Sequence, residues 1–287
     1  MKKILVPMDA TDTASVALET AFVLATAFKS LVLTLHVPTA PSVFMPPVGE
    51  GMSEDAVGHA FRRSEMESRE RSKTTRNRFD QIRERMGIPL AADETATNGP
   101  ATLWKSESGY EERIVTRLGR LSDLIVISRA TPDSRPAADE VLNAAMFQTA
   151  RPVLLAGSSA IVSAPKKIAI AWNGGQEATR AVAGAMPIIK QAESILVLTA
   201  ESSRTRADAA GELVHYLALH GLKAESRIFP KSHERPVPQA LSNECSDEGV
   251  DMLIMGAFSH NRMREFILGG VTRHVISGAS IPILMAH

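Results

Sequence analysis

The chain has 287 residues, enough for two ordinary domains with a sizeable core in each. Lys and Arg number 32 and Asp and Glu also 32, so the zero net charge argues against a binder of nucleic acid or of an anionic membrane surface. The single cysteine, Cys245, excludes an intramolecular disulfide and a cysteine metal pair, and fits the reducing cytoplasm. Asp9 and Asp12 interrupt the first apolar run, so we expect neither a signal peptide nor a membrane span.

The sequence contains an internal repeat. Residues 2–6 match 166–170 at an offset of 164, and the same offset aligns 29–34 with 193–198 without a gap. Residues 123–128 match 251–256 at an offset of 128, and 151–156 match 281–286 at 130. Because the offset falls from 164 to 128, the first half carries about 36 extra residues. We therefore predict two domains, at 1–158 and 165–287.

Each half alternates short apolar runs with longer amphipathic stretches. Runs such as 31–35, 124–127 and 195–198 lack polar alternation, which predicts strands covered on both faces, as in a parallel sheet between helix layers. We expect helices over 13–29, 52–86, 110–120 and 138–150, and over 176–191, 204–221, 236–248 and 270–279. The third strand of each half, 101–105 and 224–229, has the weakest pattern.

The extra residues of the first half lie mainly between 38 and 86. Residues 38–47 are too rich in proline for regular structure. In residues 53–85 glutamates interleave with arginines. We interpret this insertion as a long solvated helix lying on the domain, rather than as a nucleic-acid-binding arm.

The motif with the clearest chemistry follows the apolar run 252–255. Gly256 and Ser259 are followed, after nine residues, by Gly269 and Gly270 at the start of an amphipathic helix. A strand, a turn of small residues and a helix N-terminus can hold a phosphate. Glycines let the backbone approach closely, and unpaired N–H groups point at the anion.

This pattern resembles the nucleotide loop of the universal stress protein family: Gly-x-x-Gly, nine residues, Gly, then Ser or Thr. Ser259 takes the place of the second glycine and Gly270 that of the hydroxyl. The resemblance implies two repeated α/β domains of adenine nucleotide alpha hydrolase-like, Rossmann-like type, each an open five-stranded parallel sheet with helices on both faces. Family members pair their last strands across a two-fold axis. Here 152–155 and 282–285 would pair within one chain, an intramolecular pseudo-dimer, and a further homodimer is left open.

The resemblance also places ATP or another adenine nucleotide, with Mg²⁺ left open, at the carboxyl ends of the second-half strands. It implies a nucleoside site at Ala171, Trp172, Asn173, Thr199 and Ala200, and a phosphate site at Gly256, Ser259, His260, Asn261, Arg262, Gly269, Gly270, Val271 and Thr272. Two residues depart from the pattern. Asn173 stands where the family has an aspartate. Gly270 stands where the family has a serine or threonine, and the hydroxyl of Thr272, two residues later, could partly replace the missing one. Trp172 either borders the adenine or packs, and the sequence leaves both open.

The first half has lost the motif. Ser128 stands where the repeat has Gly256, and Asp139 and Glu140 occupy the next helix start, where they would repel a phosphate. Asp9 remains after the first strand, and we interpret it as a turn residue rather than a ligand contact. We expect this half to be structural or regulatory.

Together these features predict a tandem universal stress protein, a cytoplasmic stress-response module that signals by nucleotide occupancy. We expect no catalytic residue, no protein metal site, and at most slow ATP hydrolysis assisted by His260. One alternative is a nucleotide-free interaction protein that binds an unknown protein partner through the inserted helix. Another is a sensor of a less anionic small ligand in the first-half cleft. Neither nucleic acid nor a membrane is an expected partner.

Overall fold

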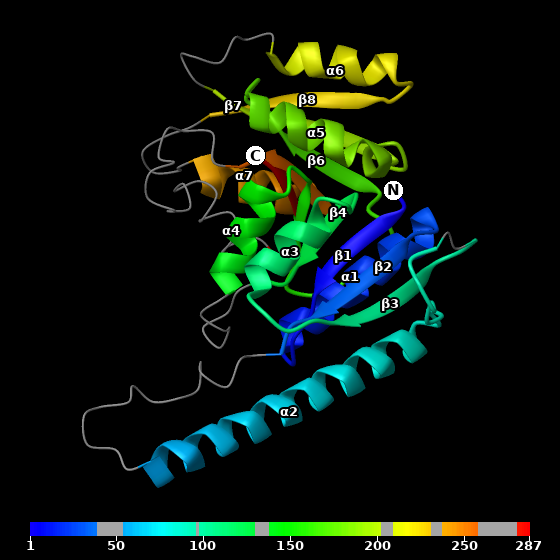
Figure 1. Cartoon of the computed structure of the whole chain (residues 1–287). Helices are drawn as coiled ribbons and strands as arrows, with labels where there is room; N and C mark the ends of the chain where they lie inside the picture. The colour runs from blue at the N-terminus through cyan, green and yellow to red at the C-terminus, as the bar shows by residue number, and fades with distance from the viewer. Residues whose placement is uncertain (39–53, 96–97, 130–137, 202–208, 231–236, 258–279) are drawn as a thin grey trace.

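A computed structural model gives the structure of residues 1–38, 54–95, 98–129, 138–201, 209–230, 237–257 and 280–287. The strands form a single ten-stranded sheet in the order β3-β2-β1-β4-β5-β10-β9-β6-β7-β8 (Figure 1). Each half contributes five neighbouring parallel strands, so the chain is two repeated α/β domains joined edge to edge. The predicted fold class is confirmed.

The helices and strands follow the predicted alternation. The first half contains β1 (Lys3–Pro7), α1 (Asp12–Phe28), β2 (Leu31–His36), α2 (Glu54–Arg85), β3 (Ala101–Ser106), α3 (Glu111–Gly119), β4 (Leu124–Ile127), α4 (Ala138–Gln148) and β5 (Val153–Leu155). The second contains β6 (Lys167–Ala171), α5 (Gln176–Ile189), β7 (Ser194–Ala200), α6 (Ala209–Leu219), β8 (Ala224–Phe229), α7 (Val237–Asp247), β9 (Met252–Gly256) and β10 (Ile283–Ala286). The helix expected at 270–279 and the first five residues of the helix expected at 204–221 lie outside the described residues.

Two core layers cover the two faces of the sheet. One contains side chains of α1, α2, α5 and α6, and the other side chains of α3, α4 and α7. Central strands such as β2 and β4 are buried at every residue, because successive side chains enter opposite layers. No helix in these described ranges is both long and apolar enough to span a bilayer.

The two halves meet through β5 and β10, the strands expected to pair. They are antiparallel neighbours, and Leu154 lies opposite Leu284. These two leucines are equivalent at the repeat offset of 130, so a pseudo-two-fold axis passes between them. Each strand thereby covers what would otherwise be an exposed apolar edge of the other half.

The strand register corrects one detail of the repeat. In the first half Lys3 pairs with Leu31, whereas the equivalent Lys167 pairs with Ser194. The second strands are therefore related by an offset of 163, not by the gapless 164 of the sequence alignment. With this register, the counterpart of Thr199 is His36.

The inserted helix α2 is a long, charged helix lying against the first half, as predicted (Figure 1). Its C-terminal part buries one stripe, Thr75, Phe79 and Ile82, against the core that α1 also covers. Its acidic and basic side chains pair along the helix in i,i+4 bridges, such as Arg63–Glu67 and Arg76–Asp80. The arginines are therefore partly neutralised, which does not favour a nucleic-acid arm.

Candidate functional site

The carboxyl ends of β6, β7 and β9 meet at one edge of the second half. Ala171, the last residue of β6, lies beside Leu198 of β7 and Met255 of β9 in the strand registers. This brings the predicted residues Ala171 to Asn173, Thr199, Ala200 and Gly256 to the same edge of the sheet. It is the place where parallel α/β sheets hold ligands.

Asn173 builds the turn between β6 and α5. Its side-chain oxygen accepts a hydrogen bond from the Gly175 N–H at 2.9 Å, and Gly174 takes a left-handed φ of 71°. In the first half the Asp9 carboxylate accepts hydrogen bonds from the backbone and hydroxyl of Thr11, at 2.9 and 2.5 Å. Amide and carboxylate thus make the same turn, so replacing Asp by Asn preserves the backbone. The Asn173 residue is otherwise exposed.

Trp172 is a packing residue. Its indole is half-buried against the core, and its N–H donates to the Ala209 carbonyl at 2.9 Å. This bond ties the end of β6 to the start of α6. Thr199 is buried, and its hydroxyl donates to the Trp172 carbonyl at 3.1 Å. The polar groups of both side chains therefore have partners within the protein, and Ala200 is the small, partly exposed residue beside them.

Gly256 allows β9 to pack tightly against α5. A Cβ at this position would lie 2.5 Å from the Ala178 nitrogen and 2.8 Å from the Glu177 carbonyl carbon. Real Cβ atoms do not approach backbone atoms so closely, so glycine is required here for packing. The phosphate-loop interpretation did not include this second role. The remaining predicted phosphate residues, Ser259, His260, Asn261, Arg262, Gly269, Gly270, Val271 and Thr272, lie outside the described residues.

The corresponding corner of the first half is filled by protein side chains. His36 is buried, one ring nitrogen (Nδ1) lies 3.1 Å from the Met8 carbonyl oxygen, and the other (Nε2) lies 3.0 Å from the Ser72 hydroxyl of α2. Its ring stacks on Trp104 of β3 at 5.7 Å. The Arg76 guanidinium lies 5.2 Å from the Trp104 ring centre. Thr199 and His36 thus contact equivalent carbonyls. The His36 ring is the larger side chain, and it also contacts α2 through Ser72.

The His36 cluster escaped the sequence analysis. The sequence signal was the polar residue His36 at the end of the largely apolar strand β2. The gapless alignment matched His36 with Ala200, whereas the strand registers match it with Thr199. Farther along this edge, Arg129 follows β4, and one guanidinium nitrogen donates to the Ala156 carbonyl at 3.4 Å. Burial lowers the pKa of Arg129 from its ordinary value. Over the described ranges, no three acidic, histidine or cysteine side chains gather as a metal site would require.

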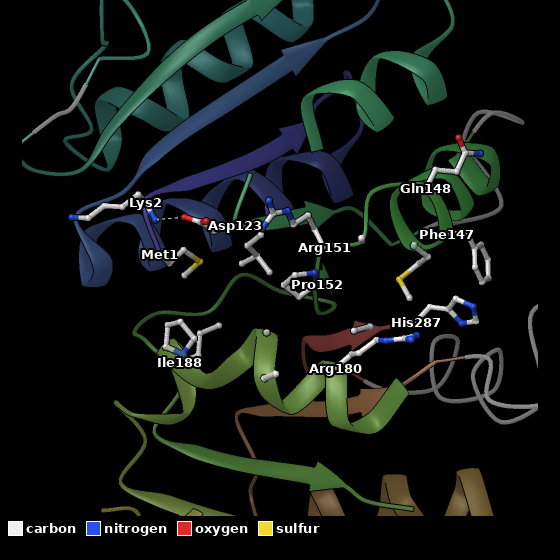
Figure 2. Close-up of a pocket in the computed structure, with 17 residues that line it drawn as sticks. Met1, Lys2, Asp123, Phe147, Gln148, Arg151, Pro152, Arg180, Ile188 and His287 are labelled. Atoms are coloured by element: carbon white, nitrogen blue, oxygen red, sulfur yellow. Dashed lines mark hydrogen bonds between the residues drawn. The ribbon is translucent and has the colours of Figure 1, made fainter. Parts of the chain in front are cut away.

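A groove of about 950 Å³ lies between the two halves (Figure 2). Its walls include Arg151 and Pro152 of the first half and Arg180 and His287 of the second. Arg151 donates two hydrogen bonds to the Arg120 carbonyl, at 2.8 and 3.1 Å. None of the described nucleotide-site residues lines this groove.

Comparison with known proteins identifies the family. The sequence model of the Universal stress protein family matches residues 1–100 and 165–287, which together exceed half of the chain. The chain belongs to the universal stress protein family. The first matched segment lies within the first half and the second coincides with the second half, so the chain is a tandem universal stress protein.

Individual relatives agree with this assignment. A universal stress protein of Synechocystis sp. is 37% identical over 46 residues, a match that spans only 16% of either chain. The crystal structure of a universal stress protein from Archaeoglobus fulgidus aligns over 99% of this chain and 97% of its own, with a TM-score of 0.67 and 13% identity. A functionally unknown protein from Pseudomonas aeruginosa aligns over 99% and 92%, with a TM-score of 0.57 and 17% identity. At these identities the structural matches show the fold.

Proposed function

We propose that this tandem universal stress protein binds ATP or another adenine nucleotide in its second half and signals by occupancy in the cytoplasm. The observation that carries the proposal is the difference between two equivalent corners. In the second half the described residues at the ends of β6 and β7 include the exposed Gly174 and the partly exposed Ala200, and a Cβ at Gly174 would meet nothing within 4 Å. In the first half, His36 and the helix α2 fill the equivalent corner.

The described residues fit a nucleoside better than a metal. Asn173 offers an exposed amide to a base or ribose, and the partly exposed Ala200 would lie beside it. The Trp172 N–H and carbonyl are already bonded to Leu198 and Thr199. None of these groups is a carboxylate, so Mg²⁺ would arrive with the phosphates rather than be held from this side. The phosphates would be held by the loop from Gly256 to Thr272, as the family motif implies.

Thermal denaturation with Mg-ATP tests the proposal. A ligand at about 100 times its dissociation constant stabilises the native state by about 2.7 kcal/mol, so the Tm should rise clearly. The double variant Gly269→Asp, Gly270→Asp gives the second-half loop two acidic residues, as the first half has in Asp139 and Glu140. It should abolish the shift. The matched variant Asp139→Gly, Glu140→Gly should leave the shift unchanged. An unshifted wild-type Tm at millimolar Mg-ATP, with no adenine nucleotide carried through purification, would refute nucleotide binding.

A nucleotide-free interaction protein is the second candidate, and one observation favours it. On α2, Phe61 is 47% exposed and Met66 is 68% exposed, although both are large apolar side chains. Such residues are common at protein interfaces. The proposal that the first-half cleft senses a small ligand is not favoured, because His36, Trp104 and Ser72 occupy that corner.

A further inference from the structure

The outer edge of β8 has no strand partner among the described residues. β8 is the last strand of the sheet, and within the described part of the chain its backbone pairs only with β7. Four consecutive residues, 225–228, are exposed. Figure 1 shows β8 with α6 at the end of the molecule opposite to β3 and α2. An edge of this kind presents unpaired N–H and C=O groups to another strand.

The opposite edge of the sheet is covered. The Thr102 N–H on β3 donates to the Pro89 carbonyl at 2.9 Å, and the Thr102 carbonyl accepts from the Ala91 N–H at 2.7 Å. Residues 89–91 therefore occupy the outer side of β3. The strand registers make Thr102 of β3 equivalent to Ala224 of β8. Residues 89–91 thus cover the β3 edge at the position that corresponds to Ala224 on the β8 edge.

The hydrogen-bond pattern shows which β8 groups face outward. The Phe229 carbonyl accepts from the Glu201 N–H at 2.9 Å, so Phe229 points toward the β7 side. In a strand with a parallel neighbour, alternate residues direct both their N–H and C=O to opposite sides. Ala224, Ser226 and Ile228 therefore direct their backbone groups outward.

We propose that β8 pairs with the β8 of a second copy of this chain, antiparallel and centred on Ser226. This register places Ser226 opposite Ser226 of the second copy and Ala224 opposite Ile228, so the outward residues exchange about six backbone hydrogen bonds. On either side of the Ser226 pair, Glu225 of one copy lies opposite Arg227 of the other, so the interface contains two such pairs. These are the non-hydrogen-bonded pairs, whose side chains approach most closely. The interface is isologous and closes as a dimer.

Charge selects this register over its neighbours. Shifting the centre by one residue sets Arg227 opposite Arg227, or Glu225 opposite Glu225, and both pairs repel. Arg227 is already held by Glu244 at 3.0 Å and Glu248 at 2.6 Å. These contacts use its two terminal nitrogens, and the Nε–H remains to meet Glu225 of the second copy. Charged residues usually discourage edge pairing, but here their order is self-complementary.

Exposed apolar side chains on β8 and α6 also favour a second copy of this chain as the partner of β8. Ile228 on β8 is 51% exposed, and on the adjacent helix α6 Tyr216 is 44% and Leu219 74% exposed. Ala224 packs against the core layer to which α6 contributes. Ile228 is four residues further along the strand, so its side chain lies on the same face of the sheet as that of Ala224, the face that α6 covers. A two-fold axis at Ser226 would bring the α6 helices of both copies to this side of the joined sheet.

A charge-swap experiment tests the pairing. By sedimentation from about 1 to about 500 µM, the wild-type chain should show a concentration-dependent dimer. Glu225→Arg alone and Arg227→Glu alone should each be monomeric, because each sets like charges opposite one another. Mixing the two variants should restore a heterodimer, since one strand then carries two arginines and the other two glutamates. Cooperative thermal unfolding of each variant alone would show that both are folded. Arg227→Glu should melt at a lower temperature, because it loses its bridges to Glu244 and Glu248. A monomeric wild type, or a mixture that does not associate, would overturn the proposal.

Cysteine crosslinking provides a second test that does not depend on charge. In the proposed pair the two Ser226 Cα atoms lie about 5.5 Å apart, within the range of a disulfide. Ser226→Cys should therefore oxidise rapidly to a covalent dimer, while the native Cys245 is buried and should not react. Leu121→Cys is the control, because Leu121 is 74% exposed on the other half. Equal rates of dimer formation by the two variants would contradict the proposed register.

Discussion

Replacing Gly256 by alanine separates the packing role of this glycine from any role in binding phosphate. The added Cβ would lie 2.5 Å from the Ala178 nitrogen and 2.9 Å from the Glu177 Cβ. Both are at the first turn of α5, and the nearer is a backbone atom that no rotamer change can move. The helix start must therefore shift away from β9. Overpacking of this kind costs typically about 1–3 kcal/mol.

The assay is urea denaturation without nucleotide, followed by far-ultraviolet circular dichroism. The Gly256→Ala variant should show a lower midpoint with an unchanged slope, equivalent to about 1–3 kcal/mol of unfolding free energy. Gly99→Ala is the matched control. A Cβ at Gly99 would meet nothing within 4 Å, so this change should leave stability unchanged or raise it by up to about 1 kcal/mol. If the two variants unfold at the same urea concentration as the wild type, the packing argument is wrong.

Three further predictions concern single side chains. Trp172→Phe removes the N–H that binds the Ala209 carbonyl and should lower the unfolding free energy by about 0.5–1.5 kcal/mol, measured by the same denaturation. Burial raises the pKa of the Cys245 thiol to about 12, so a thiol reagent at pH 8 should label it only after unfolding; rapid labelling of the native chain would contradict its burial. A hydrogen bond from Lys167, and next one from Arg227, lower the pKa of Glu248 below its ordinary value of 4.5. The ionised Glu248 therefore stabilises the folded state above pH 4.5, and this stabilisation is lost as the pH falls through the lowered pKa. Glu248→Gln should therefore lower the Tm at pH 7, and the difference should vanish in acid; a constant difference at all pH values would exclude the charge as its cause.

Strands and helices were predictable from this sequence because their signals are local. The apolar runs of β4 and β7 lack alternation since both faces of the sheet are covered, and the charged pattern of α2 reflects its exposure. The open five-stranded parallel sheet of each half was expected from the family resemblance, and the order of its strands was not predicted. The one-residue difference between the halves was missed, because it lies in the length of the helix and turn before β2 and β7, which strand patterns do not register.

The candidate site was only partly predictable. That the ends of β6, β7 and β9 meet follows from parallel pairing, and the structure brings Asn173, Thr199 and Gly256 to one edge. The partners of each side chain do not follow from the sequence. The carbonyl that accepts the Trp172 N–H belongs to Ala209, and the atoms that exclude a side chain at Gly256 belong to α5. Both are contacts between elements distant in the chain, which no local motif encodes.

His36 and Thr199 offer a direct comparison of the two equivalent corners. Both lie near the carbonyl that follows the first strand of their half, but the His36 ring also contacts Ser72 and stacks on Trp104. His36→Ala removes two polar contacts and a ring contact, and should lower the unfolding free energy by about 2–4 kcal/mol. Thr199→Val removes one hydroxyl from a position of the same shape, and should lower it by about 0.5–1.5 kcal/mol.

The same pair of variants distinguishes structural from binding roles. If the first-half corner is structural, His36→Ala should leave the Tm shift produced by Mg-ATP unchanged even though the starting Tm is lower. Thr199→Val alters the corner proposed for the nucleoside, and should reduce that shift despite its smaller effect on stability. Comparing each variant with and without nucleotide measures the two roles separately. A shift that disappears with His36→Ala and persists with Thr199→Val would place the nucleotide in the first half and overturn the assignment of the two corners.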